Sequence, residues 1–396
     1  MALPRIGFIG CGPFSTSSIY PCLHAFGHGL QPDADIEIAV RGDRAHLTND
    51  GRQGEKPAPL AELVACCDQK EELARRNQRA FGFERYYTNY HEMLEKEDLD
   101  SVFVVMHPKN GPRIAIDVMQ SGRNAYIEKP PGTTLDEARE IKAVSDATGK
   151  WCQVGFMKRF SEPFVRAKNI MAEPEFGRPS VYESRKARNG SYTPDTVYHF
   201  LNGFVCHHFD LARFYMGDVE SVYAEMVSRS EADDEGKNAA LLQQDDLYSN
   251  YYQILLEKPH VRQADGYLIL FRFTSGAIGM HNANCLEHNS NVLERVTVTG
   301  EGAVTVVEDW WTVKGFLKGR DPVWWEPIHV DAGGPMGMLR WSGYLGEVEE
   351  FIAASRESRK PSVTIDDGVK CLEIETAVRR SIAEGRRVGI SEIRAG

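Results

Sequence analysis

Between residues 62 and 156 the sequence alternates regularly between strand-like and helix-like patterns, and this alternation constrains the fold more than any other feature. Short apolar runs of strand length are each followed by an amphipathic stretch with helical periodicity. Strands that alternate with helices in this way pair in parallel as βαβ units. We expect strands over 62–68, 101–106, 124–129 and 151–156. We expect helices over 70–83, 91–100, 112–122 and 134–149, the last capped by Thr133 or Thr134.

After about residue 156 the pattern changes to period two, which is typical of strands with one buried face. Such a series predicts a mostly antiparallel sheet with one covered side. The runs with this period cover residues 180–188, 219–229, 266–285 and 294–308, and amphipathic helices are expected over 343–357 and 365–384. Because 396 residues exceed what one hydrophobic core normally supports, we expect two domains.

The segment GCGPFS lies between an expected strand over 5–10 and the start of a helix. In a dinucleotide-binding loop, the first glycine permits a tight turn and the second lets the backbone approach a pyrophosphate. The helix N-terminus then offers its free N–H groups to the phosphates. A plain strand–helix turn is the simpler interpretation, but the strand before it and the βαβ units after it favour a cofactor loop. The expected cofactor-binding residues of this loop are Gly10, Gly12, Pro13, Phe14 and Ser15.

A dinucleotide fold also needs an acidic residue at the end of its second strand to bind the ribose hydroxyls. Asp43 is nearer to the glycine loop, whereas Asp68 ends a clear strand and precedes an amphipathic helix. We prefer Asp68, because a βαβ unit requires that helix. A carboxylate at this place repels a 2′-phosphate, so NAD is favoured over NADP. The basic residues Arg41 and Lys70 lie nearby in the sequence and keep NADP as the alternative.

These patterns predict an α/β protein with two domains. Residues 1–155 are expected to form a Rossmann dinucleotide-binding domain with an insertion over about 28–60, a stretch rich in Gly, Pro, Asp and Arg. Residues 156–396 are expected to form an α+β domain around the antiparallel sheet, with a loop insertion over 231–262.

Composition argues against several classes of function. The net charge of −11 disfavours a general affinity for nucleic acid or for anionic membranes. No apolar run approaches the roughly 20 residues that span a bilayer, and the N-terminus runs directly into a strand pattern. We therefore expect a cytoplasmic protein.

The eight cysteines show no C-x-x-C pair, and several lie inside apolar strand-like runs. Free thiols in such runs commonly behave as small buried hydrophobes. A metal site would need tighter clustering, so we expect none.

The segment YIEKPPG, residues 126–132, ends a strand on a charged pair and stiffens the backbone behind it. A residue that precedes proline is biased towards extended geometry. Two interpretations are possible. Glu128 and Lys129 form a solvated pair at a surface turn, or Lys129 is held in a fixed position at the mouth of a cleft.

At this point the order of motifs resembles a known family of oxidoreductases, that of glucose–fructose oxidoreductase, inositol dehydrogenase and their relatives. The resemblance is carried by GCGPFS, VFVVMHP, EKPPG, GFMKRF and HHFDLARFYMG and spans nearly the whole chain. It implies a Rossmann domain, a second domain built on an open, mostly antiparallel sheet, and a sugar, polyol or cyclitol substrate. It also implies a homodimer or homotetramer formed through that sheet.

The resemblance implies that Lys129 is the active-site lysine. A hydroxyl that loses its proton as hydride leaves the same carbon develops negative charge, and a fixed ammonium stabilises that charge. Glu128 is a candidate to pair with another group and hold the strand end. The turn after the strand over 101–106 corresponds to the nicotinamide side of the cofactor site and adds Met106, His107 and Pro108 to the expected cofactor-binding residues, together with Glu128 and Lys129.

The family pattern has an aspartate four residues before a histidine in the second domain. His207 falls on the histidine position, but the earlier position holds Gly203. His207 remains our candidate base, since an imidazole accepts a proton near neutral pH. Asp210, His208 and, outside the motif, His199 are further candidates; a capping or core role in the following helix is the alternative for this cluster.

In GFMKRF, Lys158 and Arg159 correspond to a strand end that faces the substrate cleft in the family. A guanidinium offers a rigid fork for hydroxyls or a carboxylate. The alternative is again a solvated charged pair.

Together these features predict an NAD-dependent dehydrogenase that acts on a hydroxyl-bearing carbon of a sugar, polyol or cyclitol. A second hypothesis is an enzyme that retains NAD and uses transient oxidation for glycoside cleavage, elimination or epimerisation. A third is a non-catalytic NAD- or sugar-binding protein that has lost its proton relay at Gly203.

Overall fold

The structure, a computed structural model, describes residues 2–24, 61–187, 201–227, 266–284, 294–326 and 335–395. The expected insertions over 28–60 and 231–262 lie outside these residues, as do Arg41, Asp43 and His199. The chain divides into two compact units. The first comprises Met1–Glu162 and Pro327–Val369, and the second comprises Pro163–Glu326 and Lys370–Gly396.

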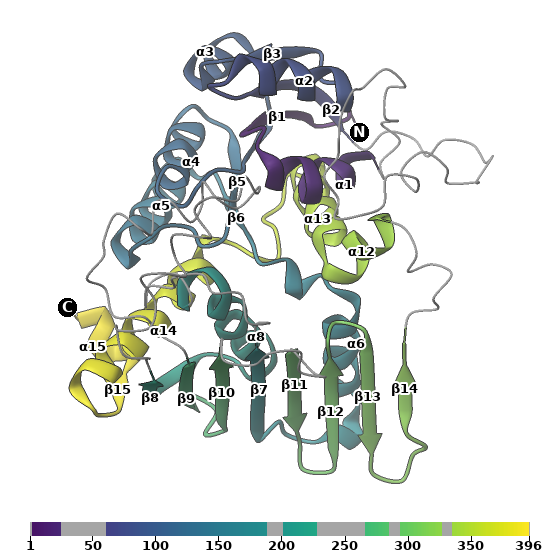
Figure 1. Ribbon diagram of the computed structural model, residues 1–396, viewed down its shortest axis with the longest axis vertical. Coiled ribbons are helices and arrows are strands. Elements are labelled where there is room, and N and C mark those ends of the chain that lie inside the picture. The colour runs from purple at the N-terminus through teal and green to yellow at the C-terminus, as the bar shows by residue number, and fades with distance from the viewer. Residues whose placement is uncertain are drawn as a thin grey trace, which may run out of the picture. The chain divides into compact units, whose positions relative to one another are not determined.

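The first unit is built on a six-stranded parallel sheet (Figure 1). Its strands are β1 (Arg5–Ile9), β2 (Glu62–Cys67), β3 (Arg85–Tyr87), β4 (Ser101–Val104), β5 (Asn124–Glu128) and β6 (Cys152–Gly155). The order β3-β2-β1-β4-β5-β6 is that of a doubly wound dinucleotide-binding fold. Because the order reverses between β1 and β4, the carboxyl ends of these strands flank the place where such folds bind ligands.

Helices connect the parallel strands, as the sequence pattern predicts. They are η1 (Ser15–Ile19), α1 (Tyr20–His24), α2 (Glu71–Phe81), α3 (Tyr90–Lys96), α4 (Gly111–Gln120) and α5 (Leu135–Thr148). The N-cap of α5 is Thr134 and not Thr133, because its side chain accepts the N–H of Glu137 at 3.2 Å. The carboxylate of Glu137 accepts the N–H of Thr134 in return, which completes a capping box.

The late helices α12 (Pro335–Ser342) and α13 (Tyr344–Glu357) also belong to the first unit, and α13 packs beside α1 (Figure 1). Phe351 of α13 contacts the ring of Phe103 on β4, with 4.3 Å between ring centroids, and the ring of Trp151 at 5.4 Å. This helix therefore completes the core of the Rossmann unit although it lies about 200 residues further along the chain.

The second unit contains a nine-stranded sheet of order β14-β13-β12-β11-β7-β10-β9-β8-β15 (Figure 1). Its strands are β7 (Val181–Ala187), β8 (Val219–Val227), β9 (Gly266–Phe273), β10 (Ile278–Asn284), β11 (Glu294–Thr299), β12 (Ala303–Glu308), β13 (Thr312–Leu317), β14 (Val323–Trp325) and β15 (Val388–Gly389). Neighbouring strands are antiparallel except for the parallel pair β7 and β10. The predicted mostly antiparallel sheet is therefore confirmed.

Burial in this sheet alternates with period two. On β9, Ile269 and Phe271 are buried, whereas Leu268 and Leu270 are exposed. Helix α8 covers the buried face, where Phe209 lies against Phe271. The remaining helices are η2 (Met157–Arg159), α6 (Glu162–Met171), η3 (Pro174–Phe176), η4 (Leu201–Val205), α8 (Cys206–Met216), α14 (Ile365–Glu384) and α15 (Ile390–Ala395).

The predicted fold class, a Rossmann domain followed by an α+β domain, is confirmed. A single boundary at residue 155 does not describe the compact units, because the segment with α12 and α13 packs with the first unit. We propose that the dinucleotide-binding domain includes this segment. No described helix is long and apolar enough to cross a membrane.

Candidate functional site

The carboxyl ends of the parallel strands bring the expected cofactor residues to one edge of the first unit. The glycine loop follows β1, Asp68 follows β2, the turn with His107 follows β4, and Lys129 follows β5. Parallel strands end at the same edge, so segments far apart in the sequence meet there.

The glycine loop has a backbone that other residues do not readily adopt. Gly10 has a φ of +104°, and a Cβ atom at this position would lie 2.1 Å from the carbonyl oxygen of Val105. The hydroxyl of Ser15 donates to the carbonyl of Gly10 at 2.7 Å, which ties the loop to the helix start. A Cβ at Gly12 would meet no atom within 4 Å. The backbone at Gly12 is thus open to close approach by a ligand, as a pyrophosphate requires.

Asp68 lies directly against this loop. Its Oδ2 accepts the N–H of Cys11 at 2.9 Å, and its Oδ1 accepts the N–H of Lys70 at 2.9 Å. The side chain is half-buried. A carboxylate at the end of β2 and beside the glycine loop fits the ribose of a dinucleotide, so these residues fit the group that the sequence predicts.

The turn after β4 packs onto the same loop. The sulfur of Met106 would lie 2.9 Å from a Cβ at Gly10, and Met106, His107 and Pro108 are all half-buried. The Nδ1 of His107 accepts the N–H of Lys109 at 3.2 Å. Burial, and next the charge of Lys109, lowers the pKa of His107, which favours a neutral ring.

Glu128 and Lys129 are not equally exposed to solvent. Lys129 is half-buried, whereas Glu128 is 8% exposed and accepts the hydroxyl of Tyr126 at 2.6 Å. Burial raises the pKa of Glu128 to about 7, against the lowering effects of Tyr126 and the Lys129 charge. The peptide bond between Lys129 and Pro130 is cis. Glu128 is therefore part of the protein interior and not a solvated turn residue.

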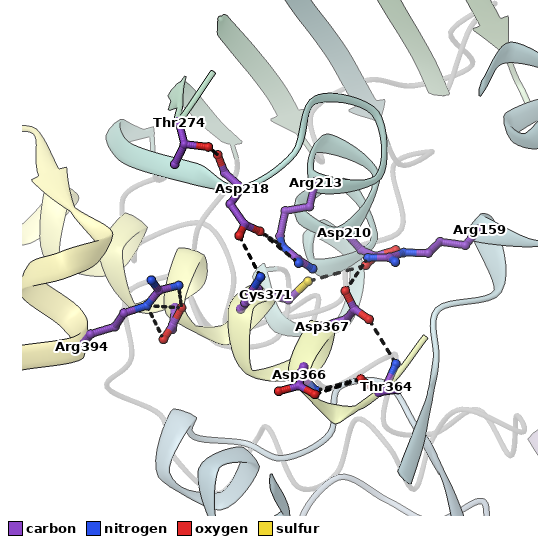
Figure 2. Close-up of polar contacts among 12 residues, drawn as sticks. Arg159, Asp210, Arg213, Asp218, Thr274, Thr364, Asp366, Asp367, Cys371 and Arg394 are labelled. Carbon is purple, nitrogen blue, oxygen red and sulfur yellow. Dashed lines mark hydrogen bonds and ion pairs between the residues drawn. The ribbon is translucent and has the colours of Figure 1, made fainter. Parts of the chain in front are cut away.

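In the second unit, His207, His208 and Asp210 lie on α8 and are all buried. The ring of His208 stacks on that of His281 with 4.3 Å between centroids, and its Nε2 lies 3.5 Å from Glu294 Oε1. Asp210 Oδ1 accepts a weak bond from the thiol of Cys371 at 3.9 Å (Figure 2). Gly203 belongs to η4, which directly precedes α8.

Lys158 and Arg159 lie on η2 in the first unit. Lys158 is 3% exposed, so it is not a solvated surface charge. Arg159 Nη2 donates to Asp367 Oδ1 at 3.0 Å, and Asp367 Oδ2 accepts the N–H of Thr364 (Figure 2). This ion pair gives Arg159 a structural partner in the first turn of α14.

Glu347 is a buried acidic residue near this edge that was not among the predicted site residues. It is fully buried on α13, and its Oε1 accepts the hydroxyl of Tyr126 at 2.7 Å. A signal was present, because Glu347 lies four residues before Phe351 and therefore on the apolar stripe of its helix. A glutamate on the apolar face of a helix is expected to be buried, and a buried glutamate is almost always paired with a specific polar group.

Two sequence families match adjoining parts of the chain. Residues 5–156 match the oxidoreductase family with an NAD-binding Rossmann fold, and residues 164–305 match the GFO/IDH/MocA C-terminal domain. Among characterised relatives, scyllo-inositol 2-dehydrogenase (NAD(+)) of Bacillus subtilis is 25% identical, over 85% of this chain and 91% of the relative. Myo-inositol 2-dehydrogenase of Thermotoga maritima is 23% identical, over 84% of this chain and 92% of the relative.

Solved structures have the same fold. A levoglucosan dehydrogenase in complex with NADH and levoglucosan superimposes with a TM-score of 0.73 at 17% identity, covering 98% of this chain and 99% of that one. An oxidoreductase from Agrobacterium radiobacter in complex with NAD+, L-tartaric acid and magnesium gives a TM-score of 0.73 at 14% identity, covering 99% and 100% of the two chains. The family matches identify NAD as the cofactor, and the chain belongs to the GFO/IDH/MocA family of oxidoreductases.

Proposed function

We propose that this protein is an NAD-dependent dehydrogenase that oxidises a hydroxyl-bearing carbon of a sugar, polyol or cyclitol. Support comes from the similarity to two inositol dehydrogenases over most of both chains. The observation that carries the proposal is the position of Lys129, half-buried at the end of β5, on the sheet edge that also holds the glycine loop and Asp68.

The reaction removes a hydride from the carbon and a proton from its hydroxyl, and leaves a ketone. NAD, when bound, accepts the hydride. Lys129 would stabilise the negative charge that develops on the hydroxyl oxygen, since an ammonium fixed at that atom is complementary to the transition state. His207 would accept the proton. The glycine at 203 means that another group must orient this imidazole, and Asp210 on the same helix is our candidate.

The role of Lys129 is tested with the variant Lys129→Ala. Loss of a charged group that stabilises the transition state typically costs roughly 3–4 kcal/mol, so kcat should fall on the order of a hundredfold or more while NAD still binds. NADH formation is followed by absorbance with a panel of inositols, aldoses and polyols, and NAD affinity by calorimetry. NADP in place of NAD should give a lower kcat/KM.

The matched control is Lys96→Ala, which removes an exposed lysine paired with Glu92 on α3. It should leave turnover unchanged. Unimpaired turnover by Lys129→Ala would refute the role of this lysine. Conversion of a substrate without net NADH would favour the enzyme that retains NAD, and ligand binding without any turnover would favour the non-catalytic protein.

We further propose a homodimer or homotetramer that forms through the outer face of the nine-stranded sheet. Leu268, Leu270 and Ile278 are 52%, 43% and 50% exposed on neighbouring strands β9 and β10. Apolar side chains that gather on an exposed sheet face are typical of an interaction surface.

We also propose that the protein works in the cytoplasm. The described cysteines are all buried free thiols, which fits a reducing compartment. Cell fractionation with an antibody against the protein tests this location.

A further inference from the structure

A buried hydrogen-bonded triad lies immediately behind Lys129. The hydroxyl oxygen of Tyr126 is 2.6 Å from Glu128 Oε1 and 2.7 Å from Glu347 Oε1. Tyr126 and Glu347 are fully buried, and Glu128 is 8% exposed. The triad joins β5 to α13, two elements that are 221 residues apart at the Tyr126–Glu347 contact.

The two hydrogen bonds of Tyr126 determine how many protons the three side chains of the triad must carry. A tyrosine hydroxyl carries one proton and can donate to one carboxylate only. Both contacts are nevertheless within hydrogen-bonding distance. One of the two carboxyl groups must therefore carry a proton and donate it to the tyrosine oxygen, while the tyrosine donates to the other.

Glu347 is the group that holds this proton. Its second oxygen, Oε2, is buried and has no hydrogen-bond donor among the described residues. An ionised Glu347 would leave that charge buried without a donor, which is strongly unfavourable. Burial, and next the charge of Glu128, raises the pKa of Glu347 well above its usual value. The ammonium of Lys129 favours the ionised form of both carboxyl groups, but Glu128 also accepts a hydrogen bond from the backbone of Lys129, which favours its carboxylate further.

The surroundings are shaped for the triad. Gly155 of β6 pairs with Glu128, and a Cβ there would lie 2.5 Å from the Tyr126 hydroxyl and 3.1 Å from Glu128 Cδ. Gln153 of β6 donates to the backbone carbonyl of Glu347 at 2.9 Å. Gly155 leaves the space that the Tyr126 hydroxyl and the Glu128 carboxyl group occupy, and the hydrogen bond from Gln153 holds α13 beside β6.

We propose that Glu347 is a positioning residue for Lys129: it stays protonated, directs the Tyr126 hydroxyl to Glu128, and so keeps Glu128 ionised beside the lysine ammonium. The catalytic part of this proposal rests on the proposed function of Lys129. The protonation part does not, and it is tested separately.

Protonation is tested by the pH dependence of unfolding. The charged and titratable groups that act on Glu347 are Glu128 and Lys129, Tyr126 that bonds to it, and Cys22 of α1. The folded protein keeps the proton, whereas an unfolded glutamate loses it above about pH 4.3. Raising the pH should therefore favour unfolding of the wild type relative to Glu347→Gln, by about tenfold in the unfolding constant per pH unit above that value.

The control for this measurement is Glu349→Gln, which removes a carboxylate from an exposed position on the same helix. Its unfolding constant should follow that of the wild type with a much smaller pH-dependent difference. Infrared spectra at neutral pH should show a protonated carboxyl band that Glu347→Gln lacks. The proposal would be overturned if the difference in free energy of unfolding between the wild type and Glu347→Gln did not change with pH, or if the wild-type spectrum lacked that band.

Positioning is tested by kinetics. In Glu347→Gln the amide N–H₂ replaces the acidic proton as donor to Tyr126, so most of kcat should remain. Tyr126→Phe removes the hydroxyl that donates to Glu128, and Glu347→Leu removes the group that directs this hydroxyl. In both variants kcat should fall on the order of tenfold and its pH profile should shift, whereas the KM for NAD should not change. Glu347→Leu and Tyr126→Phe enzymes that fold and keep the wild-type kcat and pH profile would refute positioning. If Lys129→Ala were fully active, the proposed role of Lys129 and the positioning role of Glu347 would both fail, while the protonation result would stand.

Discussion

At the scale of single residues, the cofactor loop depends on two glycines with different requirements. Gly10 has a positive φ and lies so close to Val105 that a side chain has no space. Gly12 has open space around it, so its lack of a side chain serves a ligand and not the fold.

This difference predicts opposite phenotypes for two alanine variants. Gly10→Ala should lower the free energy of unfolding by more than about 2 kcal/mol, because a left-handed conformation costs an alanine roughly 1–2 kcal/mol and the clash with Val105 adds to it. Gly12→Ala should unfold like the wild type but bind NAD more weakly. Chemical denaturation without NAD, together with NAD titration, checks both. Equal stabilities of the two variants would contradict this account.

At the scale of secondary-structure elements, the EKPPG segment is held at both of its ends. Before it, β5 pairs with β4 and β6. After it, Glu137 in the first turn of α5 accepts the N–H groups of Thr133 and Thr134, at 2.6 and 3.1 Å. The segment that carries Lys129 is thus a short bridge between a buried strand and a capped helix.

The cap of α5 gives a prediction at this scale. Thr134→Ala should reduce the free energy of unfolding by about 1 kcal/mol, because the N–H of Glu137 loses its acceptor. Thr134→Ser keeps an oxygen in place and should stay within a few tenths of a kcal/mol of the wild type. Urea denaturation measures both values. A serine variant as unstable as the alanine variant would show that the methyl group, and not the cap, stabilises this helix end.

At the scale of the whole molecule, the nine-stranded sheet leaves apolar side chains on its outer face. Leu270 on β9 pairs with Met280 on β10 and with Tyr223 on β8. Leu270 is 43% exposed, and the edge strand β14 carries Trp324 at 63% exposure. Such a surface fits an interface between copies of this chain.

The proposed oligomer therefore predicts the effect of one charge. Leu270→Asp should shift the sedimentation coefficient towards that of a monomer. Each copy of the chain in a symmetric interface carries the substitution, so at least two carboxylates would be buried among apolar side chains. The control is Glu225→Asp on β8, which changes an exposed side chain of the same sheet without a change of charge. A wild type that already sediments as a monomer would refute the interface.

Much of the fold was predictable because its signals are local. The strand–helix alternation predicted the parallel sheet, and period two predicted the covered face of the second sheet. The strands β3, β13 and β14 were not predicted; the edge strands β3 and β14 have three residues each, too few for a period to be visible. The assignment of α13 to the Rossmann unit was also missed. An amphipathic pattern indicates that one face of a helix is buried, but it does not indicate which hydrophobic core that face joins.

The sequence by itself determined the order of the elements, the glycine loop and the strand that ends at Lys129, since each is written in a few consecutive residues. Only the tertiary structure decided what lies behind that strand. The contact between Tyr126 and Glu347, and the pairing of Arg159 with Asp367, join residues 221 and 208 positions apart. No local pattern encodes such pairs, because they form only when the packing of the core brings two distant elements together and excludes water from between them.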